Sequence, residues 1–283
     1  VGAADEPRGQ SGIAHVLEHL MFKESDDLQE GEYSSRIEAM GGTHNAFTGH
    51  DFTGYYVTVP KARLSEVMAL ESKRLKTPIP SPESVAKELQ VVLEERRTRV
   101  DNRPVALLGE AMQTALFRHH PYRTPIIGWE HEIKTLTRAD ALAFHETYYH
   151  AGNAVLMLVG DIDIQEAKTL AKQHYGSWQK GATVHRHWTK EPKHQAHATM
   201  RLAHPNVEKP QLMLSYRVPS FGSDAPESAF ALMVLEYLLG GTETSHLYKN
   251  LVKEQALATS VSSYYQAFSK GPAELSIYAL PAE

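Results

Sequence analysis

A short segment near the start of the chain places three ionisable side chains within an otherwise apolar stretch. Residues 13–22 read Ile-Ala-His-Val-Leu-Glu-His-Leu-Met-Phe, so every residue except His15, Glu18 and His19 is apolar. A helix that is apolar on all sides belongs in the core of its domain. Burying three ionisable groups is costly unless they are paired or bind an ion. The segment therefore predicts a buried helix built around a polar site.

His15, Glu18 and His19 would lie on one side of that helix, within a wedge about 100° wide. Two imidazoles four residues apart can bind one metal ion, and an adjacent carboxylate can take a proton from a water held by that ion. The chain has 16 histidines and no cysteine, so a soft-metal site must use imidazole and carboxylate. A pair of buried structural histidines is the alternative interpretation.

A second helix offers a third ligand. It opens with Ser81 as the N-cap and Pro82 at its first position, and it carries an apolar stripe. Glu88 and Glu95 lie two turns apart on one flank of that stripe, separated by only about 20° around the axis. Glu94 points the opposite way, toward solvent. Helix geometry therefore favours Glu95 or Glu88 as the inward carboxylate.

Composition excludes several classes of protein. Lys and Arg total 29 against 34 Asp and Glu, and the net charge of -5 has the wrong sign for a protein that binds nucleic acid or an anionic membrane. No apolar run approaches the 18 residues or so that a transmembrane helix needs. With 283 residues, of which 42% are hydrophobic, the chain can form one large domain or two ordinary ones.

Hydrophobic periodicity predicts an α+β fold, in which helices pack on a largely antiparallel sheet. The segment 154–159 (Ala-Val-Leu-Met-Leu-Val) predicts a buried strand, and residues 179–197 are polar and lack periodicity. The other predicted strands cover 43–48, 53–59, 211–217, 260–267 and 273–279. The other predicted helices cover 61–75, 82 to just before 104, 106–117, 138–149, 164–175 and 226–239.

Several of these motifs together resemble one family of zinc peptidases. His15-x-x-Glu18-His19, followed 76 residues later by Glu95, resembles the inverted zinc motif of the pitrilysin, insulysin and mitochondrial processing peptidase family. Further segments occur in the family's order and extend the resemblance over nearly the whole chain. They are 41–48, which resembles the active-site edge strand, 91–95 with 101–104, which resemble the third-ligand helix, and 120–129, 148–161 and 240–248.

The resemblance implies a zinc-dependent endopeptidase. His15, His19 and Glu95 would bind one zinc ion per chain, and Glu18 would be the general base that activates water and passes its proton to the leaving amine. Glu88 matches a second acidic residue that assists catalysis in the family. The alternative is a non-catalytic subunit that binds peptide or a partner protein.

The resemblance also implies how substrate would bind. Asn45, Ala46 and Phe47 match the edge strand that pairs with substrate, so an unfolded or extended peptide would add to the sheet as a strand. The residue pattern is most similar to bacterial members, many of which are exported, and this favours the periplasm over the cytoplasm.

Family members contain two similar domains, and the resemblance implies a division of this chain. Residues 1–180 would form the catalytic zinc-binding domain without its first strand region, 181–197 the linker, and 198–283 the front part of the second domain. We therefore expect the chain to be a piece of something longer, with a second half or a partner subunit completing the catalytic chamber.

Overall fold

In the computed structural model the apolar segment near the start of the chain forms helix α1 (Ile13–Leu20), surrounded by other elements. The structure describes residues 1–26, 28–186 and 188–282. These residues divide into two units, which are described separately. Unit 1 comprises Val1–Thr98 and His120–Lys190, and unit 2 comprises Arg99–His119 and Glu191–Glu283.

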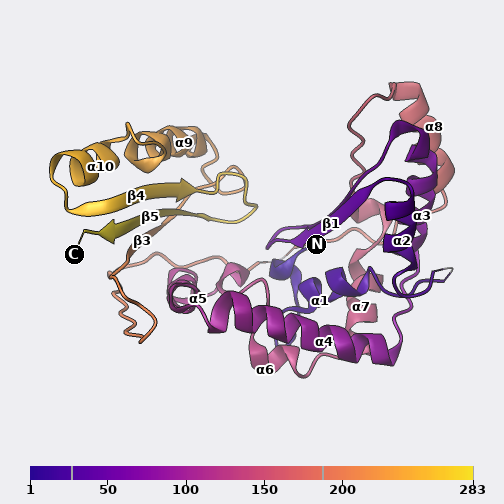
Figure 1. Cartoon of the computed structure of the whole chain (residues 1–283), viewed down its shortest axis with the longest axis horizontal. Coiled ribbons are helices and arrows are strands. Elements are labelled where there is room, and N and C mark those ends of the chain that lie inside the picture. Colours follow the sequence, from indigo (N-terminus) through magenta and orange to yellow (C-terminus); the bar gives the residue numbers. More distant parts are fainter. Residues whose placement is uncertain (27, 187, 283) are drawn as a thin grey trace. The chain divides into compact units, whose positions relative to one another are not determined.

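Unit 1 combines helices with one antiparallel hairpin (Figure 1). Its strands are β1 (Thr43–Thr48) and β2 (Thr53–Thr58), which pair from Thr43 opposite Thr58 to Thr48 opposite Thr53. Besides α1, its α-helices are α2 (Glu32–Ala39), α3 (Leu64–Lys76), α4 (Pro82–Arg96), α6 (Glu130–Ile133), α7 (Arg138–Tyr148) and α8 (Ile164–Tyr175). Its 3-10 turns are η1 (Ala3–Asp5), η2 (Lys61–Arg63), η4 (Pro121–Arg123) and η5 (Ala151–Asn153).

The core of unit 1 is built around α1, which contacts α4, α7 and β1. Ile13, Val16 and Leu20 of α1 are all but inaccessible to solvent, and Val92 of α4 packs with them. Apart from the side that carries His15, Glu18 and His19, the surface of α1 is apolar and needs packing neighbours, and this explains why a helix of only eight residues is the centre of its unit.

Unit 2 contains a three-stranded antiparallel sheet in the order β3-β5-β4 (Figure 1). The strands are β3 (Leu212–Val218), β4 (Ala258–Tyr265) and β5 (Ala273–Pro281). Helix α9 (Glu227–Gly240) packs on β4. The remaining elements are α5 (Pro104–Leu116), α10 (His246–Tyr248) and two π-helical turns, η3 (Arg97–Asp101), which spans the boundary with unit 1, and η6 (Lys249–Glu254).

The fold is therefore mixed α+β with small antiparallel sheets, and most elements lie where hydrophobic periodicity predicts them. The predicted ranges 43–48 and 164–175 coincide with β1 and α8. Helix α2 was not predicted, because only Tyr33 and Ile37 of its eight residues are buried and the apolar pattern is sparse. Among the described residues, no helix combines the length and apolar character required to cross a membrane.

The prediction of a buried strand at 154–159 is wrong. In the described part of the chain this segment pairs with no strand, and Val155, Met157 and Val159 are 88%, 79% and 94% exposed. A run of β-branched and long apolar residues indicates a preference for extended backbone, but a strand also needs a neighbour to accept its hydrogen bonds.

Candidate metal centre

The first turn of α1 is anchored by the side chain of Glu6. The N-cap residue, Gly12, has φ 87° and no side chain to cap the helix. Glu6 Oε1 instead accepts hydrogen bonds from the backbone N–H groups of Gly12 at 3.1 Å and Ala14 at 3.0 Å. A Cβ atom at position 12 would lie 2.7 Å from the carbonyl oxygen of Ile127. Both the positive φ and this close approach therefore require glycine there. These contacts fix the turn that carries His15.

Three side chains from α1 and α4 form a group that could bind a metal ion. One potential ligand atom from each of His15, His19 and Glu95 lies within 4.8 Å of the others. Glu95 Oε2 is 3.6 Å from His15 Nε2 and 3.4 Å from His19 Nε2. Two imidazole nitrogens and one carboxylate are a donor set that zinc takes in proteins. The residues present therefore fit a zinc ion, with the Nε2 atom of each histidine turned to the carboxylate.

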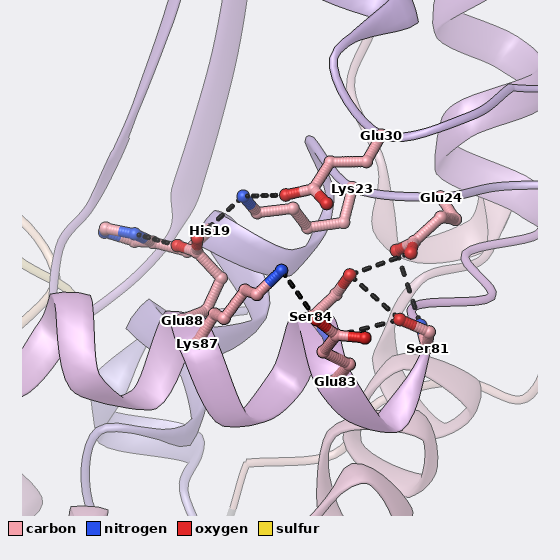
Figure 2. A network of polar contacts seen from close by, with 9 residues as sticks. All are labelled: His19, Lys23, Glu24, Glu30, Ser81, Glu83, Ser84, Lys87 and Glu88. Carbon is pink, nitrogen blue, oxygen red and sulfur yellow. Dashed lines mark hydrogen bonds and ion pairs between the residues drawn. The ribbon is translucent and has the colours of Figure 1, made fainter.

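The second ring nitrogen of His19 contacts Glu88. His19 Nδ1 lies 3.1 Å from Glu88 Oε2, as Figure 2 shows. Burial lowers the pKa of His19, but the hydrogen bonds with Glu88 and Glu95 outweigh it and raise that pKa to about 9. A carboxylate on the far nitrogen of a metal-binding imidazole fixes the ring's orientation and tautomer. Glu88 is placed to do this for His19.

Glu18 lies on the same helix and is 8% exposed. Its Oε2 atom accepts a hydrogen bond of 2.5 Å from the hydroxyl of Thr48, the last residue of β1. The carboxylate thus comes from the metal-site helix and is held by the hairpin. A buried, hydrogen-bonded carboxylate beside a metal site can accept a proton from water.

On helix α4, Glu88 and Glu95 lie on the side that faces the histidines, and Glu94 lies on the exposed side. Its start is fixed by Ser81, whose hydroxyl accepts a hydrogen bond from the backbone N–H of Ser84 at 3.1 Å. Glu88 is buried and the Glu95 side chain is 17% exposed, whereas the Glu94 side chain is 61% exposed and pairs with a neighbouring arginine. The structure brings Glu95 to both histidines and Glu88 to His19 alone.

Asn45, Ala46 and Phe47 lie in the middle of β1. Asn45 and Phe47 point to the exposed face of the hairpin, and Ala46 points to the half-buried face together with Thr48. Among the described residues β1 pairs only with β2, so its other edge has no strand beside it. Phe47 is 46% exposed and packs edge-to-face with Phe52.

Glu6, Lys23 and Thr48 also belong to the surroundings of the site, and none of them was predicted from the sequence. Thr48 carried a usable signal, because it lies two residues after Ala46 and so faces the same side of a strand. Lys23 carried none, because its partner Glu88 lies 65 positions away in the sequence. Glu6 carried none, because it lies outside the helix whose N–H groups it accepts from.

A buried helix that presents two histidines to a glutamate on a second helix could hold a metal ion through a His-His-carboxylate ligand set. Residues 1–130 match the family described as "Insulinase (Peptidase family M16)", and residues 135–282 match "Peptidase M16 inactive domain". The chain therefore belongs to peptidase family M16, as the motif resemblance predicted.

Similar proteins include several that are named zinc proteases. The chain is 33% identical to "Zinc protease PqqE" of Helicobacter pylori over 93% of this chain and 59% of that protein. It is 31% identical to an uncharacterised zinc protease of Mycobacterium leprae over 99% of this chain and 62% of that protein. The chain thus spans about three fifths of the length of these relatives.

Solved structures share the fold. The crystal structure of a protease from Helicobacter pylori superposes with a TM-score of 0.92 at 31% identity, over 99% of this chain and 67% of that one. The periplasmic protease PqqL from Escherichia coli superposes with a TM-score of 0.78 at 21% identity, over 100% of this chain and 32% of that one. These matches place the whole chain within the M16 fold.

Proposed function

We propose that this chain carries the catalytic site of a zinc-dependent endopeptidase that hydrolyses unfolded or extended peptides. One observation carries the proposal. His15, His19 and Glu95 form a compact donor set, and a further buried carboxylate, Glu18, lies between the two histidines in the sequence of one helix. The names of the relatives support zinc as the metal and peptide hydrolysis as the reaction.

In this proposal each residue has a distinct task. His15, His19 and Glu95 hold one zinc ion, which when bound supplies a Lewis acid that polarises the scissile carbonyl and makes water more acidic. Glu18 accepts the proton of the attacking water and then delivers it to the leaving amine. Glu88 assists by holding the imidazole of His19 through Nδ1, so that Nε2 stays directed to the ligand group.

Peptide would bind along β1. The edge of β1 that does not face β2 offers backbone N–H and C=O groups, and Asn45, Ala46 and Phe47 are its central residues. An extended peptide that pairs with this edge is held through its backbone, which suits substrates without folded structure. The hydrogen bond from Thr48 to Glu18 links this strand directly to the general base.

The proposal also includes the division of the chain. Residues 1–180 would be the catalytic zinc-binding domain, 181–197 the linker, and 198–283 part of a second, similar domain. Since the chain spans about three fifths of its relatives' length, a second half or a partner subunit would complete the chamber around the site.

Glu18→Gln tests the proposal because it keeps the size and hydrogen-bonding shape of the side chain but cannot take a proton. We expect the variant to bind zinc as the wild type does and to cleave fluorescently labelled, unfolded casein about 10²- to 10⁴-fold more slowly. Cleavage at the wild-type rate would contradict the role of Glu18. Zinc binding without any cleavage by the wild type, even with the remainder of the chamber supplied, would favour the non-catalytic subunit.

A further inference from the structure

Lys23 follows α1 closely and joins two carboxylates, as Figure 2 shows. Its ammonium group lies 2.7 Å from Glu88 Oε1 and 3.0 Å from Glu30 Oε1. The Lys23 side chain is only 19% exposed, and that of Glu88 is 9% exposed, so this pair is largely withdrawn from water. Partly buried ion pairs of this kind lose less to solvent screening than surface pairs do.

The two oxygens of Glu88 serve different partners. Oε2 contacts His19 Nδ1, and Oε1 contacts the ammonium group of Lys23. The terminal torsion of a glutamate side chain is soft, so a carboxylate held at one oxygen alone can turn about it. With a partner on each oxygen, the plane of the Glu88 carboxylate is fixed, and with it the direction from which His19 is held.

Charge gives a second reason for a cation at this place. Glu88 and Glu95 both approach His19, and Glu18 lies one residue before it. Keeping a buried carboxylate ionised without a partner is costly. The ammonium group of Lys23, 2.7 Å from Glu88 Oε1, supplies a positive partner at this place.

We propose that Lys23 is a positioning residue of the metal centre, which acts through Glu88 to hold His19 in the orientation that binds zinc. Glu30 in turn holds Lys23 from the more exposed side, since its own side chain is 43% exposed. The chain of contacts runs from the ligand His19 to Glu88, then to Lys23, then to Glu30. This inference rests on the proposed zinc site.

Zinc affinity tests the inference, measured on the metal-free protein by competition with a chromophoric chelator. Lys23→Met removes the charge but keeps an unbranched apolar stem, and we expect it to weaken zinc binding about 10- to 100-fold, as loss of an outer partner of a metal ligand does. Lys23→Arg keeps a cation that can reach Glu88. We therefore expect this variant to bind zinc much more tightly than Lys23→Met does, with an affinity close to that of the wild type. Glu30→Gln should weaken binding less than Lys23→Met.

Lys87→Met is the matched control. Lys87 lies one residue before Glu88 on α4, but its ammonium group pairs with Glu83 at 2.9 Å and its side chain is 60% exposed. We expect this variant to bind zinc with wild-type affinity. The free energy of unfolding of each metal-free variant is measured in urea. If the ion pair were purely structural, its loss would lower that free energy and leave the zinc dissociation constant unchanged.

The results that would overturn the inference are distinguishable from one another. A wild type that binds zinc, with Lys23→Met binding within twofold of it, would show that Glu88 needs no help from Lys23. A folded wild type that binds no zinc would overturn the proposed function itself, and the inference with it. If Lys23→Met does not fold, Lys23→Gln and Glu30→Gln decide the question, and wild-type zinc affinity in both variants would contradict the inference.

Discussion

The hydroxyl of Thr48 donates a hydrogen bond of 2.5 Å to the carboxylate of Glu18. This bond joins the last residue of β1 to the helix that carries both histidines. The same hydroxyl lies 3.4 Å from that of Thr53, the first residue of β2. The orientation of the proposed general base is thus set by the hairpin on which peptide would bind.

Thr48→Val should reduce turnover without removing the metal. Valine keeps the branched shape but cannot donate a hydrogen bond, and a hydrogen bond to a charged group contributes about 1.5–3 kcal/mol. We expect kcat on labelled casein to fall about 10- to 100-fold, with zinc content and KM close to the wild type. Thr43→Val, at the exposed opposite end of β1, is the control and should retain activity. Loss of activity in both variants would show that the strand itself is damaged.

Zinc binding should release protons near neutral pH. Without metal, hydrogen bonds with Glu88 and Glu95 hold the pKa of His19 at about 9, against the effect of burial, so His19 is protonated at pH 7.5. A zinc ligand must be neutral imidazole, and the proton therefore leaves when the metal binds. Calorimetric titrations in buffers of different ionisation enthalpy should show at least about one proton released per zinc. No release at pH 7.5 would contradict this account of His19.

The affinity of the site for zinc should depend on pH. Because protons compete with zinc for His19, affinity should fall as the pH decreases below about 9, by up to about tenfold per pH unit. Glu88→Gln removes one of the groups that raise the pKa of His19, so the decline should begin at a lower pH in that variant. Identical pH profiles would indicate that Glu88 does not interact with His19 in solution.

Glu6 should make stability decrease with rising pH. Burial raises its pKa from the ordinary 4.5 to about 8, although hydrogen bonds from Ala14 and Gly12 oppose this. The folded state therefore holds the proton more tightly than the unfolded state. The resulting stabilisation is complete below about pH 4.5 and is lost as the pH rises to about 8, at up to about 1.4 kcal/mol per pH unit.

Glu6→Gln isolates this effect, because glutamine resembles the protonated acid. We expect the wild type to lose stability relative to Glu6→Gln between pH 5 and about 8.5, as measured by urea unfolding of the metal-free protein. Parallel curves for the two proteins over this range would show that Glu6 does not titrate with a raised pKa.

Much of the site's composition was predictable from the sequence, because helix geometry is local. The spacing of His15 and His19 places both imidazoles on one side of α1, and the 100° rotation per residue separates Glu94 from Glu88 and Glu95. The choice between Glu88 and Glu95 was not predictable from that geometry. It depends on where α4 lies along α1, and tertiary packing sets this position.

Contacts between distant segments explain what sequence reasoning missed. Thr48 reaches Glu18 across 30 positions, and Lys23 reaches Glu88 across 65, so no local periodicity reveals either pair. The segment 154–159 is the reverse case, because the sequence predicts a buried strand there and the described part of the chain has none at these positions. Its apolar pattern is strong, yet burial depends on a neighbouring strand, and none pairs with it among the described residues.

The zinc content of the purified, folded chain tests the central claim most directly. Elemental analysis after zinc loading and removal of excess metal would be made on the wild type, His15→Ala and Glu95→Gln. We expect about one zinc per wild-type chain and loss or clear weakening of zinc binding in both variants. A folded wild type that retains no zinc, or variants that retain as much as the wild type, would contradict it.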